Sequence, residues 1–138
     1  MMSSKYWAAC AVLGGLLVAT IPAAAHHSIA SQYVFGEEIE ITGTLKRVAW
    51  IRPHSIAILE VTNPLGGPKE EWIFEFAGLD RALSGQLRAA PSRGGLAPGE
   101  TYTMYGFRAK NGKTQAFLKQ LKMPDGRIVV AWFGDPNG

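Results

Sequence analysis

The sequence predicts an all-β domain with one short helix, folded as an OB-like Greek-key barrel of five or six strands. Apolar and polar residues alternate with a period of two in several segments, as they do in strands with one buried face. Gly, Pro and Asn clusters separate these segments, and one stretch with helical spacing follows the third of them. The order of three strands, a helix and two or three strands is that of the OB-fold, and a small β-sandwich is the alternative.

The first predicted strand begins at Glu37 and is long enough to bend. Its apolar positions alternate up to Leu45 and then change phase, so that Val48 and Trp50 continue the pattern on the other parity. Such a slip predicts a bulge or a strong bend near Lys46.

The later elements follow from composition and turn residues. The second strand is rich in β-branched residues, and the third alternates aromatic rings with other side chains. The helix has leucines at i, i+4 and i+8, although Gly85 weakens it. An Asn-Gly turn links the fourth and fifth strands. The predicted ranges are 54–62 and 70–77 for the second and third strands, 79–87 for the helix, and 101–109, 115–123 and 127–133 for the remaining apolar runs.

The first residues have the organisation of a secretory signal peptide. Lys5 provides the positive charge, residues 6–21 form the apolar run, and Ala23 and Ala25 form an A-x-A cleavage site. The run is shorter than the roughly 20 residues that span a bilayer, so a retained anchor is the less favoured alternative. We expect cleavage after Ala25, or alternatively after Ala24, and a periplasmic or secreted protein with no stable membrane span after processing.

The predicted organisation is a single domain with short flanking segments. The signal peptide covers residues 1–25, an N-terminal arm 26–36, the OB-like domain 37–134 and a C-terminal tail 135–138. The one cysteine of the chain lies in the leader, so the exported protein has neither disulfides nor thiolate ligands. The formal net charge is +3, and removal of Lys5 with the leader makes it smaller. So small an excess of positive charge does not indicate a nucleic-acid partner.

Several short motifs occur in an order that is similar to a known family. They are residues 25–28 (AHHS), 41–45 (ITGTL) running to Trp50, Pro53 with His54, Trp72 with Phe74 and Glu75, 96–100, 105–112 (YGFRAKNG) and 124–127 (PDGR). Together they resemble DUF6152, a family of small exported bacterial proteins of unknown function. The resemblance implies an OB-like barrel and supplies no activity. The chain departs from the family pattern at Arg52, where Asn usually precedes the Pro-His pair, and at residues 89–95, a loop where a tryptophan is common.

The three histidines of the chain suggest a copper(II) site. Cleavage after Ala25 gives His26 a free α-amine beside its imidazole, His27 follows directly, and His54 begins the second predicted strand. Copper(II) favours imidazole nitrogens in a tetragonal arrangement. We expect the His26 amine and ring to bind copper(II), with His27, His54 or both completing the site. In the alternative, the first two histidines form a frayed terminus and His54 bonds a backbone carbonyl.

Aromatic and basic side chains offer a second candidate site on the barrel face. OB-folds commonly bind ligands through exposed rings. The candidates are Trp50, Trp72 and Tyr105, with Arg108 as their basic neighbour. Packing in the core is the alternative for each ring, because a small barrel without disulfides needs large side chains inside. The partner in this interpretation is an unknown envelope protein or a small ligand.

The carboxylates do not form a catalytic pair. Glu71 and Glu75 share a strand face but lie roughly 13 Å apart along an extended chain, which exceeds the spacing that glycosidases use. No serine occurs in a nucleophile-elbow motif. The sequence therefore predicts an exported, non-enzymatic binding or accessory module, and copper redox chemistry at the terminus is the one catalytic alternative.

Overall fold

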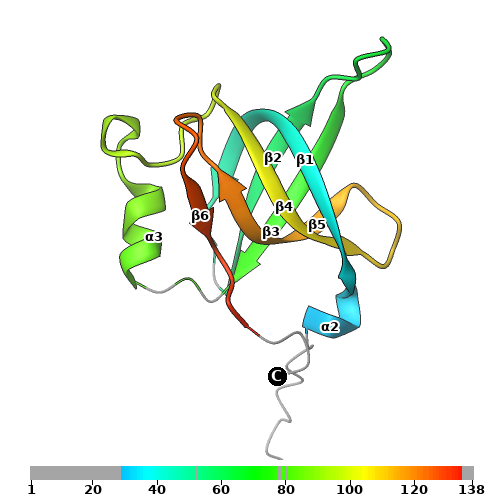
Figure 1. The fold of residues 1–138 in the computed structure, drawn as a ribbon, viewed down its shortest axis with the longest axis horizontal. Coiled ribbons are helices and arrows are strands. Elements are labelled where there is room, and N and C mark those ends of the chain that lie inside the picture. Colours follow the sequence, from blue (N-terminus) through cyan, green and yellow to red (C-terminus); the bar gives the residue numbers. More distant parts are fainter. Residues whose placement is uncertain (1–28, 52, 78, 80, 135–138) are drawn as a thin grey trace, which may run out of the picture.

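Strands form the body of the fold, and short helices lie beside them (Figure 1). The computed structural model describes residues 29–51, 53–77, 79 and 81–134. The elements, in chain order, are α2 (Ile29–Gln32), β1 (Tyr33–Ala49), β2 (His54–Val61), β3 (Glu70–Ala77), α3 (Arg81–Arg88), the 3-10 turn η1 (Pro91–Arg93), β4 (Thr101–Ala109), β5 (Gln115–Lys122) and β6 (Ile128–Val130). The predicted signal peptide and the predicted tail lie outside the described residues.

The six strands form one sheet in the order β3-β2-β1-β4-β5-β6. Neighbours in this order pair antiparallel, whereas β3 and β5 pair in parallel, from Ile73 with Gln115 to Glu75 with Phe117. The parallel pairing closes a ring of hydrogen bonds through five strands. Among the described strands β6 pairs with β5 alone, outside the ring. The mostly β class and the order of strands and helix are as predicted.

The long strand β1 begins at Tyr33, four positions before the predicted start at Glu37. Tyr33 pairs with Ala109 of β4, and the register then shifts before Glu38 rejoins the ladder. Gly36 lies within this shift at a φ of 102°, which glycine adopts readily. The irregularity hides the period of two that marks a strand, so the prediction of an arm without strand structure up to Gly36 was wrong.

The other element boundaries agree closely with the predictions. The register between β1 and β2 shifts between Leu45 and Arg47, which confirms the predicted bulge. The bounds of β3 and β4 are those predicted, while β2 and β5 each end one residue earlier, at Val61 and Lys122. The last apolar run is a strand only at Ile128–Val130.

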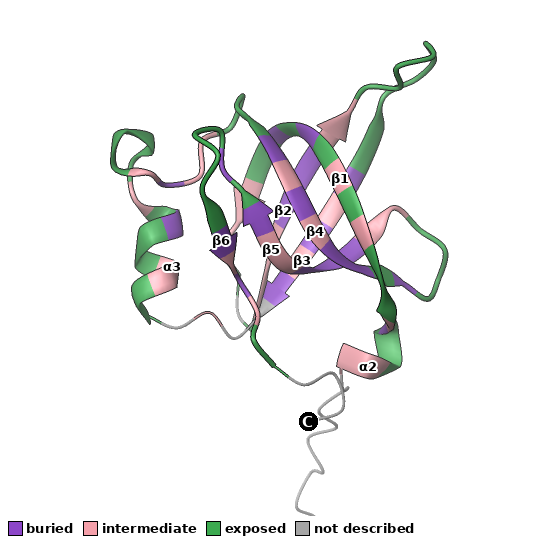
Figure 2. Cartoon of the chain, viewed as in Figure 1, coloured by how far each residue is buried: buried purple, intermediate pink, exposed green. Residues whose placement is uncertain are grey.

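The main core is formed by side chains from all six strands and from α3, and Figure 2 shows buried positions between less buried ones along β4. Trp72, Phe74 and Phe76 all belong to it, which confirms that they share one face of β3. Its buried members are Leu45, Ala57, Leu59, Trp72, Phe74, Phe76, Leu87, Tyr102, Met104, Ala116, Leu118, Leu121, Met123, Val129 and Ala131.

A second, smaller cluster packs on the opposite face of β5. Phe117 belongs to it, whereas its neighbours Ala116 and Leu118 point into the main core. Successive side chains of a strand point to opposite faces, so this cluster lies outside the ring. It consists of buried Tyr33, Phe107, Ala109 and Phe117, covered by Ile29, Phe35 and Trp132. Ile29, Tyr33 and Phe35 of the predicted arm thus pack against β4 and β5.

The helices are short, and α3 lies beside β6 (Figure 1). α3 spans Arg81–Arg88, two residues after the predicted start of the helix, and its Leu87 is buried in the main core. The four-residue α2 was not predicted, because so short a helix shows no periodicity. Across residues 29–134, apart from positions 52, 78 and 80, no helix has the length and hydropathy of a membrane span.

Candidate functional site

His54 is the first residue of β2, and it lies beside Glu75 of β3. In the register of these strands His54 faces Ala77 and Ile56 faces Glu75. Residues two positions apart share a face, so the side chains of His54 and Glu75 project from the same side of the sheet. The imidazole is 35% exposed and the carboxylate 14% exposed. This pair therefore sits at the protein surface with its carboxylate largely covered.

The His54 ring is held by a hydrogen bond between its Nδ1 and Oε1 of Glu75. An ionised carboxylate only accepts hydrogen bonds, so Nδ1 carries the proton and donates it. In the neutral tautomer that donates from Nδ1, the lone pair is on Nε2, the ring nitrogen that does not bond to Glu75. A histidine oriented by a carboxylate in this way is the usual arrangement of a metal ligand.

Tyr33 bonds to the other oxygen of the same carboxylate, and Gln115 bonds to Tyr33. The Tyr33 hydroxyl donates to Glu75 Oε2 at 2.5 Å, and Gln115 Nε2 donates to the Tyr33 hydroxyl at 3.0 Å. Tyr33 is only 2% exposed. Burial raises the pKa of the Tyr33 phenol, and the hydrogen bond and charge of Glu75 raise it further. We call His54, Glu75, Tyr33 and Gln115 the His54 network; it joins the starts of β1, β2 and β5 to β3.

Replacing Tyr33 with phenylalanine is expected to make the free energy of unfolding fall less steeply as the pH rises in the alkaline range. Up to about pH 10 the tyrosine is neutral in both states, whereas above it the unfolded chain ionises and folded Tyr33 keeps its proton. The folding free energy that Tyr33 contributes therefore falls as the pH rises above 10, by up to about 1.4 kcal/mol per pH unit. Urea unfolding of both proteins at pH 8 and pH 11 measures the difference.

Tyr102 provides the internal reference for this comparison. Burial also raises its pKa, and it is present in both proteins, so it affects both slopes equally. Equal pH slopes for the wild type and Tyr33→Phe would contradict the assignment of a raised pKa to Tyr33.

The predicted copper ligands are divided between described and undescribed residues. His26 and His27 lie outside the described residues, and His54 is placed. The described chain begins at Ile29, four residues before Tyr33 of the His54 network. Within residues 29–134, less positions 52, 78 and 80, no group of three or more His, Cys, Asp or Glu side chains is arranged to hold a metal. A site with three such ligands at His54 would therefore need at least one side chain from outside the described residues, such as His26 or His27.

The structure brings two residues of the predicted ring site together, Arg108 and Trp72. The Arg108 guanidinium carbon lies 5.2 Å from the centre of the Trp72 ring. Trp72 is only 4% exposed and belongs to the main core, as the packing alternative requires. A ligand that stacked on this ring would have to displace Arg108.

The remaining two rings have other neighbours. Trp50 meets the edge of Phe76 at 5.7 Å between centroids, and the guanidinium carbon of Arg88 lies 4.6 Å from the Trp50 ring. Tyr105 is half-buried in β4, where Glu40 of β1 is its register partner.

Comparison with known proteins supports the resemblance that the motifs suggest. No curated protein matches the chain. The DUF6152 family model matches residues 13–118, which run from the predicted leader into β5 and include Tyr33, His54, Glu75 and Gln115. The chain therefore belongs to DUF6152, a family of unknown function.

Proposed function

We propose that this protein is an exported, non-enzymatic module that binds copper(II) through its processed N-terminus. The His26 amine and imidazole supply two nitrogens, and His54, with or without His27, completes the site. Copper(II) favours such nitrogen ligands in tetragonal geometry. The predicted signal peptide supports export to the periplasm or the medium. Its removal after Ala25 would leave His26 with the free α-amine that the site needs.

The His54 network carries this proposal. Metal-binding histidines almost always donate their second ring N–H to a carboxylate or carbonyl, which fixes the ring and raises its basicity. Glu75 is bonded by His54 Nδ1 and by the Tyr33 hydroxyl, so the imidazole is held through Nδ1, and Nε2 is the nitrogen left for a metal.

The position of the network also supports the proposal. Tyr33 connects directly to Glu75 and follows Ile29 by four residues along the chain. His26 precedes Tyr33 by seven positions in the sequence, so the processed terminus begins close to the His54 network along the chain.

We further propose that the five-stranded ring is an OB-like barrel. The parallel pairing of β3 with β5, the antiparallel pairing of β1 with β4, and the position of α3 between β3 and β4 support this architecture. The bulge after Leu45 in β1 gives the bend that closure of a sheet needs. The barrel holds the His54 network rigid while the N-terminal segment approaches it.

A copper(II) titration read by electron paramagnetic resonance tests the proposal. The protein is exported and processed in a bacterial periplasm, and the matched control carries one extra residue before His26. We expect one tight tetragonal site in the processed protein and at least about tenfold weaker binding in the extended form, because the amine is displaced from the chelate. Weak binding that the extra residue leaves unchanged would contradict the proposal.

A further inference from the structure

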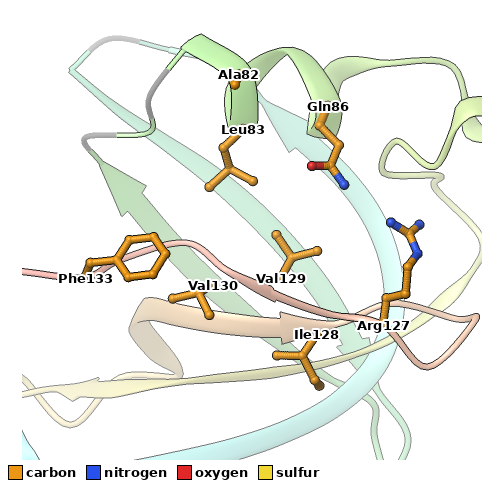
Figure 3. Close-up of a pocket in the computed structure, with 8 residues that line it drawn as sticks. All are labelled: Ala82, Leu83, Gln86, Arg127, Ile128, Val129, Val130 and Phe133. Atoms are coloured by element: carbon orange, nitrogen blue, oxygen red, sulfur yellow. The ribbon is translucent and has the colours of Figure 1, made fainter.

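A groove runs between α3 and the edge of β6, and residues outside the His54 network line it. Its volume is about 520 Å³, within the range of roughly 300–1,000 Å³ for ligand sites. Ala82, Leu83 and Gln86 of α3 line one side, and residues 127–130 with Phe133 line the other. Figure 3 shows Leu83 reaching from α3 toward Val129, with Arg127 and Phe133 at opposite ends.

The backbone of β6 offers hydrogen-bonding groups on this side. The Met123 N–H donates to the Arg127 carbonyl, and the Ala131 N–H donates to the Lys119 carbonyl, so Arg127 and Ala131 face β5. In an antiparallel ladder alternate residues turn their backbone groups to opposite edges. Ile128 and Val130 therefore direct their N–H and C=O groups away from β5, where no strand of the described chain pairs with them.

Two apolar side chains of the groove lining are strongly exposed. Ile128 is 50% exposed and Phe133 is 84% exposed, two of the four large hydrophobic residues on the described surface that are exposed to this degree. An exposed strand edge beside apolar side chains is the arrangement to which extended peptides add as a further strand. The occupant that fits is therefore an extended segment with apolar side chains.

The positive charge of Arg127 favours one orientation of that segment relative to β6. Arg127 is the one charged side chain among the described residues that line it. Its Nε donates to Asp125 at 2.7 Å, and its terminal nitrogens carry four further N–H donors. Arg127 precedes β6 in the chain, so a strand antiparallel to β6 ends beside it. A carboxylate at that end is attracted, whereas a parallel strand would place its start there.

We propose that this groove binds an extended, apolar peptide segment that adds to β6 as an antiparallel strand and ends in a carboxylate held by Arg127. The segment bonds to the backbone of Ile128 and Val130 and places side chains against Leu83 and Phe133. This interaction surface is independent of the copper site, because none of its residues belongs to the His54 network.

A synthetic peptide tests the proposal by nuclear magnetic resonance. The probe is an N-acetylated hexapeptide of alternating threonine and valine with a free C-terminal carboxylate, added to ¹⁵N-labelled full-length processed protein. We expect saturable shifts of the Ile128 and Val130 amide signals and roughly tenfold weaker binding of the same peptide with a C-terminal amide. A peptide N-methylated at every residue is expected not to bind, since it has no N–H group to donate to the backbone of β6.

Variants of exposed residues make the test specific. Ala82→Trp fills the groove from α3 and is expected to abolish binding, whereas Arg81→Trp adds the same ring one residue earlier, outside the groove lining, and retains it. Arg127→Gln is expected to bind the acid and amide peptides equally. Binding that Ala82→Trp or N-methylation leaves intact, no shift at millimolar peptide, or a concentration-dependent dimer through Ile128 would each overturn the proposal.

Discussion

Replacing Trp72 with alanine is expected to lower the free energy of unfolding by about 3–5 kcal/mol, the usual cost of removing a buried tryptophan. The ring is 4% exposed, contacts Phe74 at 6.4 Å between centroids, and lies in the main core. A domain of this size has about 5–15 kcal/mol of stability in total, and this chain has no disulfide to add to it. Urea unfolding followed by far-UV circular dichroism measures the loss.

Leu65 provides the matched control for truncation of an apolar side chain. It is 94% exposed in the turn between β2 and β3, so Leu65→Ala is expected to change stability by no more than about 0.5 kcal/mol. If Trp72→Ala prevents folding altogether, Trp72→Phe can be measured instead. Its phenyl ring still fills part of the space of the indole, so it is expected to lower the free energy of unfolding by less. A change below about 1 kcal/mol in Trp72→Ala would show that the ring is not a core residue and would restore it as a ligand platform.

Replacing His54 with glutamine is expected to weaken copper(II) binding by about 100-fold or more. Loss of a second-shell partner alone costs about 10–100-fold in metal affinity, and loss of a ligand costs more. Glutamine keeps an N–H donor for Glu75, so the carboxylate and Tyr33 retain their partners while the imidazole is removed. Competition with a chelator of known copper affinity, on processed protein, measures the change.

Glu71 supplies the control for this variant. It lies on the same strand as Glu75, but its carboxylate bonds to Lys46 at 2.5 Å and stands apart from His54. Glu71→Gln is therefore expected to leave the copper affinity unchanged. An affinity in His54→Gln equal to that of the wild type would remove His54 from the site and leave the terminal histidines as its only protein ligands.

Local patterns explain why much of the fold is predictable from the sequence. β3 alternates large rings with Glu71, Ile73 and Glu75, so its bounds and its buried face follow from five or six adjacent residues. The start of β1 is different, because Gly36 and the register shift interrupt the alternation there. The strand at Tyr33 depends on its pairing with β4, which lies far away in the chain.

The candidate site is less predictable for the same physical reason. His54 is visible as one of three histidines, but Glu75 lies 21 positions away, and Tyr33 is 42 positions from Glu75 and 82 from Gln115. No local pattern relates side chains at such separations, and only the closure of the ring through β3 and β5 brings Gln115 beside Glu75. The ring candidates failed to gather because Trp72 faces the core and Tyr105 faces away from it.

The most direct test of the copper proposal is pulsed electron paramagnetic resonance on copper-loaded, processed protein, which detects the remote nitrogen of each coordinated imidazole. The account predicts modulation from at least two imidazoles in the wild type and one fewer in His54→Gln. Identical modulation in the two proteins would contradict coordination by His54 and with it the role that we assign to the His54 network.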